Sequence, residues 1–350
     1  MIAGEYSVLE PDKQAIVVAV NRFMNAEIKE NDQNLLSLPQ LGLNNVTWDS
    51  TDTEVNFSSS DSKLTFVRNA IKTFNLFIEE ESIQPRPFSL FITSELDDPS
   101  GKKYGLGSSA AVVVTTITSM FKFYECEKLQ PTKELIYKLS AIAHFKTQGN
   151  GSCADIAAST YGGWIQYAAF TSTWLLDELR NETPIRKIVE KSWPSLLIEN
   201  ITPPAGLILC VGWTGNVAAT APMITKINHL RDSWPIEYAN FIEQSERAVS
   251  SLITSFENND STLAISCLTH NREAINLLSD SAGVNIETPK LKTLIQLAEK
   301  YGSGKTSGAG GGDCGIAFVQ DEKAAEQLYK EWKSEAILPL RLHVSKNGAL

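Results

Sequence analysis

Two glycine-rich segments constrain this chain of 350 residues more than any other feature. Residues 103–111 are KYGLGSSAA, and residues 305–315 are KTSGAGGGDCG, in which five of the eight residues 308–315 are glycine. A strand-like apolar segment follows the second segment directly, so a flexible linker explains it poorly. Because glycine lets the backbone approach a ligand and adopt positive φ, a loop shaped around an anion is the better interpretation.

The first segment lies between a predicted strand and a predicted apolar helix. Its small residues Ser108, Ser109, Ala110 and Ala111 leave the N-terminus of that helix open, where free amides and the helix dipole favour a phosphate. Serine hydroxyls also suit Mg²⁺, and Lys103 adds a mobile positive charge at the edge of the loop. The segment lacks the GxxxxGK(S/T) pattern, which disfavours an ordinary P-loop NTPase. By itself it fits a glycine turn with a serine N-cap equally well.

Two further segments are short and polar. Residues 150–157, NGSCADIA, place Asp155 where a small-residue loop meets an apolar helix, so its carboxylate could orient or deprotonate an incoming hydroxyl or phosphate. Taken alone, this segment is better explained by an acidic residue that stabilises a helix N-terminus. Residues 3–10, AGEYSVLE, open the chain beside the first predicted strand and indicate nothing specific in isolation.

Composition excludes several function classes. The net charge of −10 disfavours a general nucleic-acid binder, which usually presents a basic face. No apolar run approaches the roughly 20 residues of a membrane span, and the N-terminus lacks a signal peptide, so we expect a cytoplasmic protein without a membrane partner. Five widely spaced cysteines without a CxxC pair, and four histidines without an HExxH motif, argue against a disulfide framework and a zinc site.

Strand-like and helix-like segments alternate along the chain, which indicates an α/β or α+β protein. Strands are predicted at residues 14–20, 88–93, 206–213, 316–319 and 340–344, with a hairpin partner at 22–29. Helices are predicted at residues 64–78, 108–124, 131–146, 236–256, 261–278, 288–300 and 322–332. Residues 31–62 are expected to be loops with short edge strands. The length suggests about two domains, and four prolines in the weakly patterned residues 183–204 place the boundary there, giving domains 1–200 and 201–350.

Together, the segments at 3–10, 103–111 and 305–315 resemble the three motifs of the GHMP kinase family, in the same order and across nearly the whole chain. With residues 211–215, VGWTG, the chain most resembles the bacterial phosphomevalonate kinases of that family. The resemblance implies an α+β fold of two domains, the first similar to the second domain of ribosomal protein S5 and the second ferredoxin-like. It also implies transfer of phosphate from ATP, with Mg²⁺, to (R)-5-phosphomevalonate, which gives 5-diphosphomevalonate in the mevalonate pathway of isoprenoid biosynthesis.

The resemblance further implies roles for individual residues. Lys103 and Asp155 would be catalytic, and Ser109 would be a Mg²⁺ ligand. The ATP phosphates would be bound by Lys103, Gly105, Leu106, Gly107, Ser108, Ser109 and Ala110. Phosphomevalonate would be bound by Tyr6, Ser152, Lys305, Ser307, Gly308, Ala309 and Gly310. Because a phosphate acceptor with a second pKa of about 6 is largely ionised at neutral pH, we expect Asp155 to orient the substrate and not to remove a proton.

Several interpretations stay open beside this one. Family members usually carry a lysine before the first motif, in a segment similar to PGK(L/I)Y, and this sequence begins at Met1 without it, so we expect either an incomplete or misassigned start or impaired catalysis. A mevalonate kinase is one alternative, although residues 143–146 lack the carboxylate that such enzymes tend to carry there. A family member that binds ligands without turnover is another. We expect small-molecule partners, leave a homo-oligomer open, and interpret His144 and Cys153 as structural.

Overall fold

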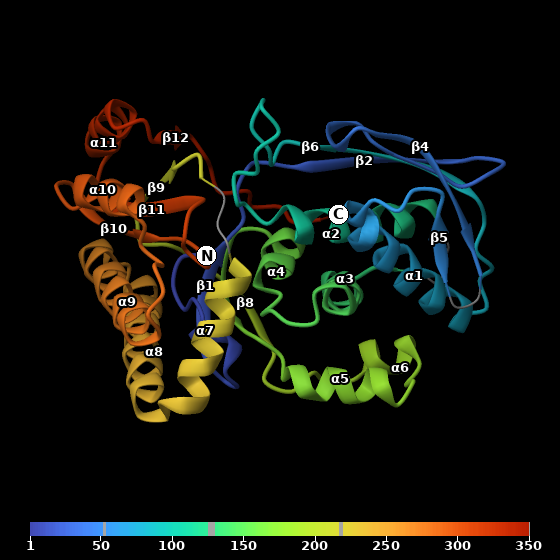
Figure 1. The fold of residues 1–350 in the computed structure, drawn as a ribbon, viewed down its shortest axis with the longest axis horizontal. Coiled ribbons are helices and arrows are strands. Elements are labelled where there is room, and N and C mark those ends of the chain that lie inside the picture. The colour runs from blue at the N-terminus through green and yellow to red at the C-terminus, as the bar shows by residue number, and fades with distance from the viewer. Residues whose placement is uncertain (52–53, 125–129, 217–219, 350) are drawn as a thin grey trace.

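The computed structural model describes residues 1–51, 54–124, 130–216 and 220–349, and arranges them in three β-sheets covered by helices (Figure 1). The strand order is β1-β7-β8 in one sheet, β2-β6-β3-β4-β5 in the second and β10-β11-β9-β12 in the third. The strands are β1 (Gln14–Val18), β2 (Met24–Glu30), β3 (Leu35–Leu38), β4 (Leu43–Ser50), β5 (Val55–Phe57), β6 (Phe88–Ser94), β7 (Trp164–Ala168), β8 (Leu197–Ile201), β9 (Ile208–Trp213), β10 (Gly302–Thr306), β11 (Cys314–Val319) and β12 (Leu338–Leu340). The α-helices are α1 (Thr65–Glu80), α2 (Ser108–Phe123), α3 (Lys133–Gln148), α4 (Ala154–Tyr161), α5 (Ser172–Arg180), α6 (Ile185–Glu190), α7 (Thr220–Ser233), α8 (Pro235–Glu257), α9 (Ser261–Ala282), α10 (Pro289–Ala298) and α11 (Glu322–Ser334). This mixture of helices and sheets confirms the predicted α+β class.

The N-terminal half is built around helices α1, α2 and α3, which pack against one another, while α2 also packs on β2. Helix α1 forms because its apolar residues recur every three or four positions, so that Val67, Ile71, Phe74 and Ile78 are buried on one face. The side chains of this face join the largest apolar core of the described residues. The position of α2 matters most for function, because its N-terminus follows the first glycine-rich segment.

Residues 31–62 differ from the prediction of loops with short edge strands. Strand β3 lies inside the five-stranded sheet, where it pairs parallel with β6 and antiparallel with β4. In β4, buried Val46 and Trp48 alternate with exposed polar residues, which is the two-residue period of a half-buried strand. The exposed residues of β4 include Asn44, Asn45, Asp49 and Ser50, and these polar residues obscure that period in the sequence.

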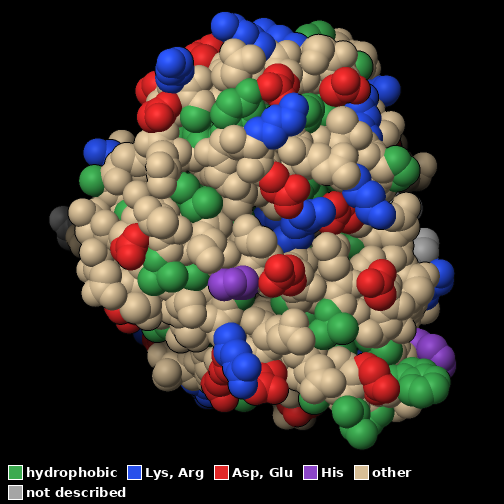
Figure 2. Space-filling view, turned by 90° about the vertical axis from the view of Figure 1, so that its left-hand side faces the viewer, with side chains coloured by type: hydrophobic (Ala, Val, Ile, Leu, Met, Phe, Trp, Pro, Cys, Tyr) green, Lys and Arg blue, Asp and Glu red, His purple; other side chains and the backbone are tan. Residues whose placement is uncertain are grey.

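The C-terminal half is built on the four-stranded sheet, in which every pairing is antiparallel. The long helices α8 and α9 pack along each other, and α9 and α10 cover β10. Figure 2 shows the face of the molecule on this side, where Lys and Arg side chains lie beside Asp and Glu side chains. On these helices Arg272, for example, pairs with Glu287 at 2.7 Å and with Glu299 at 2.5 Å. Side chains of opposite charge therefore lie next to one another on this face.

Strand β10 is a feature that the sequence pattern conceals, because its residues GSGKT belong to a glycine-rich run. A Cβ atom at Gly304 would lie 2.8 Å from the Cβ of Ala298, so helix α10 can approach the strand only where side chains are absent. The backbone of β10 pairs with β11 from Gly302 to Thr306. The segment predicted as one loop from 305 to 315 is thus a strand end, a shorter loop and the start of β11.

The chain passes from one half to the other between β8, which pairs with β7, and β9, which lies in the four-stranded sheet. The predicted division into domains 1–200 and 201–350 stays a prediction. The last described residues return to the N-terminal half, where Ser345 accepts a hydrogen bond from Gly163 and donates one to Ala19. The strand predicted at 340–344 is wrong in its bounds, because β12 covers Leu338–Leu340 and shares only Leu340 with that range. Within the described ranges no helix is long and apolar enough to cross a membrane.

A buried ion pair joins the start of the chain to β10. The Nζ atom of Lys305 lies 2.5 Å from Oε1 of Glu5 and donates to the carbonyl oxygen of Thr306 at 2.7 Å. The two side chains are 0% and 2% exposed, and burial lowers the pKa of Lys305 while Glu5 opposes that shift. The structure therefore corrects the predicted placement of Lys305 in a substrate loop, because this strand residue turns its ammonium group toward Glu5.

We predict that Lys305→Met strongly destabilises the fold. The substitution leaves the Glu5 carboxylate buried without its cation, a loss of about 3–5 kcal/mol in the free energy of unfolding, measured by urea denaturation. The matched control is Lys300→Met, which removes a 2.8 Å pair with Glu331 from a lysine whose side chain is 56% exposed, and which should leave the urea midpoint nearly unchanged. Equal losses in the two variants would contradict the structural role of the buried pair.

Candidate active site

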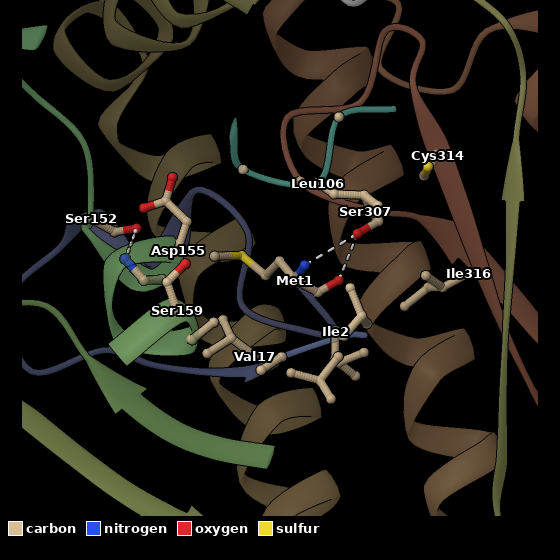
Figure 3. A pocket seen from close by; sticks show the side chains of 18 of the residues that line it. Met1, Ile2, Val17, Leu106, Ser152, Asp155, Ser159, Ser307, Cys314 and Ile316 are labelled. Carbon is tan, nitrogen blue, oxygen red and sulfur yellow. Dashed lines mark hydrogen bonds between the residues drawn. The ribbon is translucent and has the colours of Figure 1, made fainter. Parts of the chain in front are cut away.

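A cavity of about 390 Å³ brings together segments that are far apart in the sequence. Its wall includes residues 105–107 before α2, residues 151–155 at the start of α4, Ser307 and Gly308 after β10, and residues of β1, β9 and β11. Figure 3 shows Ser152 and Asp155 on one side of the cavity and Leu106, Ser307 and Cys314 on the other. The two glycine-rich segments, which are the second and third family motifs, and the loop that carries Asp155 thus line the same cavity.

The two glycine-rich loops touch at Gly105. This residue has φ +79°, and a Cβ atom there would lie 2.6 Å from the Cβ of Asp313. Tyr104 packs edge-on against Trp213 of β9, with ring centroids 5.1 Å apart, and its carbonyl oxygen accepts a hydrogen bond from the Cys314 thiol at 3.1 Å. The loop before α2 therefore packs against the C-terminal sheet. This close contact of the two backbones requires glycine at position 105, because any side chain there would collide with Asp313.

The N-terminus of α2 faces the cavity without a side-chain cap. Gly107, the N-cap residue, lies in the left-handed region at φ +83°, and no side chain accepts a hydrogen bond at this cap. The first amides of the helix therefore keep their capacity to bind an anion, with the helix dipole in support. Ser108, Ser109 and Ala110 form this first turn, and Leu106 lines the cavity beside it.

Asp155 is positioned by a strained loop that leads into α4. Cys153, the residue before the helix, has φ 56°, and the carboxylate of Asp155 accepts a hydrogen bond from the amide of Ile156 at 3.0 Å. A Cβ atom at Gly107 would lie 3.4 Å from the Cβ of Asp155, so the loop before α2 passes directly by this residue. The structure thus places the predicted catalytic aspartate beside residues 103–107, the loop before α2 that is predicted to bind phosphate and is called the phosphate loop below.

Two buried tyrosines support the loop that carries Ser152. The hydroxyl of Tyr167 donates to the carbonyl oxygen of Ser152, and it also lies 2.8 Å from the hydroxyl of Tyr137. Burial raises the pKa of both tyrosines well above the ordinary value, so both stay protonated. Burial also raises the pKa of Cys153, so its thiol remains neutral beside the cavity.

The third motif meets the cavity only in part. Ser307 and Gly308 line it, and the Ser307 hydroxyl donates to the carbonyl oxygen of Met1 at 2.8 Å. Tyr6 is 8% exposed, and its hydroxyl donates to the carbonyl oxygen of Ala309 at 2.5 Å, so Tyr6 supports the loop from behind. Of the predicted substrate residues, Tyr6, Lys305, Ala309 and Gly310 are not part of the described wall.

The cavity is poor in fixed positive charge. Its described lining residues include no lysine or arginine, and their titratable side chains are His144, Cys153, Asp155 and Cys314. Lys103, the predicted catalytic cation, is exposed, is not among these lining residues and forms an isolated β-bridge with Asp97. Apart from the Met1 amino group, which lines the cavity and whose pKa is lowered by burial, anions here would depend on backbone amides and on a cation that arrives with the ligand.

His144 is a residue of this site that the sequence led us to interpret as structural. It lies on α3, is 3% exposed, and lines the cavity with Asp155. Its Nε2 atom lies 3.4 Å from Oγ of Ser109, and its ring packs on Phe66 with centroids 5.1 Å apart. The signal in the sequence is a single histidine among apolar helix residues, which by itself does not distinguish a core residue from a site residue.

The residues near the N-terminus of α2 determine whether a magnesium ion could bind there together with ATP. No group of three or more His, Cys, Asp and Glu side chains suited to a metal ion occurs in the described part of the chain. Mg²⁺ at a nucleotide site, however, is usually bound through one or two protein oxygens together with substrate phosphates. Ser109 and Asp155 supply such oxygens beside the uncapped end of α2, so the donor set fits a metal that arrives with a nucleotide.

Comparisons with known proteins agree with this geometry. The family model for the N-terminal domain of GHMP kinases matches residues 66–163, and the model for their C-terminal part matches residues 256–337. The phosphomevalonate kinase of Streptomyces sp. strain CL190 is 32% identical over 99% of this chain and 95% of its own length. The mevalonate kinase of Thermococcus sibiricus is 26% identical over 99% of this chain and 94% of its own.

Solved structures show the same architecture. A protein from Listeria innocua superposes with a TM-score of 0.92 at 36% identity, covering 98% of this chain and 94% of that chain. The phosphomevalonate kinase of Streptococcus pneumoniae in complex with phosphomevalonate and AMPPNP superposes with a TM-score of 0.84 at 27% identity, covering 98% and 96%. The motif order, the shared cavity and these matches along the whole length have one explanation: the chain belongs to the GHMP kinase family.

Proposed function

We propose that this chain transfers the γ-phosphoryl group of ATP to the phosphate of (R)-5-phosphomevalonate, giving ADP and 5-diphosphomevalonate in the mevalonate pathway. The observation that carries the proposal is the cavity lined by the second and third family motifs and by the Asp155 loop, in a chain 32% identical over 99% of its length to a phosphomevalonate kinase. A related structure that contains phosphomevalonate and AMPPNP supports the same pair of ligands. The free, buried cysteines of the described residues support a cytoplasmic enzyme.

In this proposal the phosphates of ATP bind at the N-terminus of α2. The amides of Gly107 to Ala110 donate to phosphate oxygens, and the glycines at 105 and 107 keep the loop close to the ligand. Mg²⁺, when bound, supplies charge neutralisation at the phosphates, with Ser109 as the protein ligand we propose. Lys103, two residues before the cavity-lining Gly105, neutralises the transferred group. Because the reaction joins two anionic groups, the protein promotes it mainly by positioning these groups and neutralising their negative charge.

Phosphomevalonate lies in the cavity between Ser152 on one side and Ser307 and Gly308 on the other. Tyr6, Lys305, Ala309 and Gly310 act behind these residues, by holding the loop that presents Ser307 and Gly308. Asp155 orients the substrate, since its carboxylate lies beside the loop before α2 and an ionised phosphate acceptor needs no base. Mevalonate is the second candidate substrate, because several related sequences are mevalonate kinases.

The experiment is a turnover assay with the full chain, which measures ADP release with phosphomevalonate and with mevalonate in parallel. We expect kcat/KM to favour phosphomevalonate on the order of 10⁴-fold, because a site built for a charged group rejects the analogue that lacks it. Turnover of mevalonate alone would identify a mevalonate kinase. Calorimetric binding of a non-hydrolysable ATP analogue without turnover of either substrate would identify a ligand-binding family member.

We predict that Gly105→Ala impairs the reaction far more than Gly101→Ala. Both glycines have positive φ, +79° and +83°, so both variants carry about 1–2 kcal/mol of backbone strain. Only at Gly105 would the new Cβ collide with Asp313, which displaces the loop and lowers kcat/KM for ATP by about 10²-fold. Similar losses in steady-state kinetics for both variants would show that the contact between the loops does not position the nucleotide.

We predict that Asp155→Asn lowers kcat by about 10²-fold without changing the shape of the pH profile. The acid limb of kcat/KM should follow the acceptor phosphate, whose second pKa is about 6, so activity rises as pH increases through that value in both proteins. Asn keeps the size of the side chain and removes its charge, which tests orientation against proton removal. Loss of the acid limb in the variant would assign Asp155 the role of a general base.

A further inference from the structure

His144 is buried beside the proposed phosphate loop, yet neither the motifs nor the proposed mechanism uses it. Its ring packs on Phe66 from α1, its Nε2 atom lies near Ser109 from α2, and Asp155 from α4 lines the same cavity. The distance of 3.4 Å between Nε2 and the Ser109 oxygen is long for a hydrogen bond, as is common at catalytic sites before ligands bind. The other ring nitrogen, Nδ1, is buried and has no hydrogen-bond partner among the described residues.

The buried Nδ1 atom indicates which tautomer the imidazole adopts. A neutral histidine carries one N–H donor and one acceptor nitrogen. Buried N–H groups without a partner are rarer than acceptors without one, because an orphaned donor loses all of its hydrogen bonding to water. The proton therefore belongs on Nε2, where the Ser109 oxygen accepts it, and Nδ1 keeps its lone pair.

With the proton on Nε2, one N–H of the ring is available toward Ser109. The Ser109 hydroxyl, with one lone pair engaged by Nε2–H, keeps its own proton free for another acceptor.

We infer that His144 is a positioning residue, which donates from Nε2–H to the Ser109 oxygen and thereby directs the Ser109 hydroxyl proton to a phosphate oxygen of the nucleotide. This inference rests on the proposed function, since it deepens the role of the phosphate loop. The residue acts through Ser109 and touches no reacting atom. A chain of two donors that ends on an anion also strengthens both hydrogen bonds, because each polarises the next.

The first test is spectroscopic and does not depend on turnover. Two-bond ¹H–¹⁵N spectra of the full chain identify the tautomer of each of the four histidines, and the His144 signals are assigned by their loss in His144→Gln. We expect a neutral ring that is protonated at Nε2, near neutral pH. A proton on Nδ1, or a doubly protonated ring, would overturn the inference.

The second test compares variants at position 144. Gln places an amide donor where Nε2 lies, Asn places it near Nδ1, and Phe keeps only the packing on Phe66. We expect His144→Asn and His144→Phe to lower kcat/KM for ATP by about 10-fold to 100-fold with KM for phosphomevalonate unchanged, and His144→Gln to recover most of that loss. His270→Gln, on the exposed face of α9, is the matched control and should behave as wild type.

A double-mutant cycle with Ser109→Ala decides whether His144 acts through Ser109. If it does, the losses of Ser109→Ala and His144→Asn do not multiply when the two changes are combined. Multiplying losses, or equal activity of the Gln and Asn variants, would overturn the inference. If wild type turns over no phosphomevalonate, the proposed function fails. The role of His144 is then still tested by its tautomer and by the affinity of the variants for a non-hydrolysable ATP analogue.

Discussion

The buried ion pair between Glu5 and Lys305 is the interaction on which the rest of the site depends. It joins the segment before β1 to β10 in a part of the protein that water does not reach, so either charge alone would be strongly unfavourable. Because Lys305 is held in this way, the residues after it, Ser307 and Gly308, leave the strand at a defined point of the cavity. Tyr6, one residue after Glu5, holds the same loop through Ala309.

Beside this ion pair, the cavity that we propose for the anionic substrates has few charged side chains in its wall. The described wall of the cavity offers backbone amides, an uncapped helix N-terminus and hydroxyls, and includes no lysine or arginine. Such donors are oriented before the ligand arrives, and they carry no full charge that the empty site would have to bury. The overall charge of −10 is therefore no guide to the charge of the ligands.

The sequence predicted much of the fold where one face of an element is apolar. Helix α1 and strand β11 appear close to the predicted positions, because burial imposes a period that the residues show. The prediction failed for β3, β4 and β10, where polar or glycine residues hide the period and pairing with distant strands decides the structure. The roles predicted for Lys103, Ser109 and Asp155 stay predictions, although the structure places Asp155 beside the phosphate loop.

By itself, the sequence determined the identity and order of the motifs, and with them the family, because glycine and small residues at those positions are demanded by local backbone geometry and close approach to a ligand. Only the tertiary structure decided which motif residues face the cavity. It turned Lys305 inward to Glu5, set Asp313 against Gly105, and brought His144 to Ser109. These contacts join residues that are tens to hundreds of positions apart, so no local pattern encodes them, and they arise from the packing of helices and sheets.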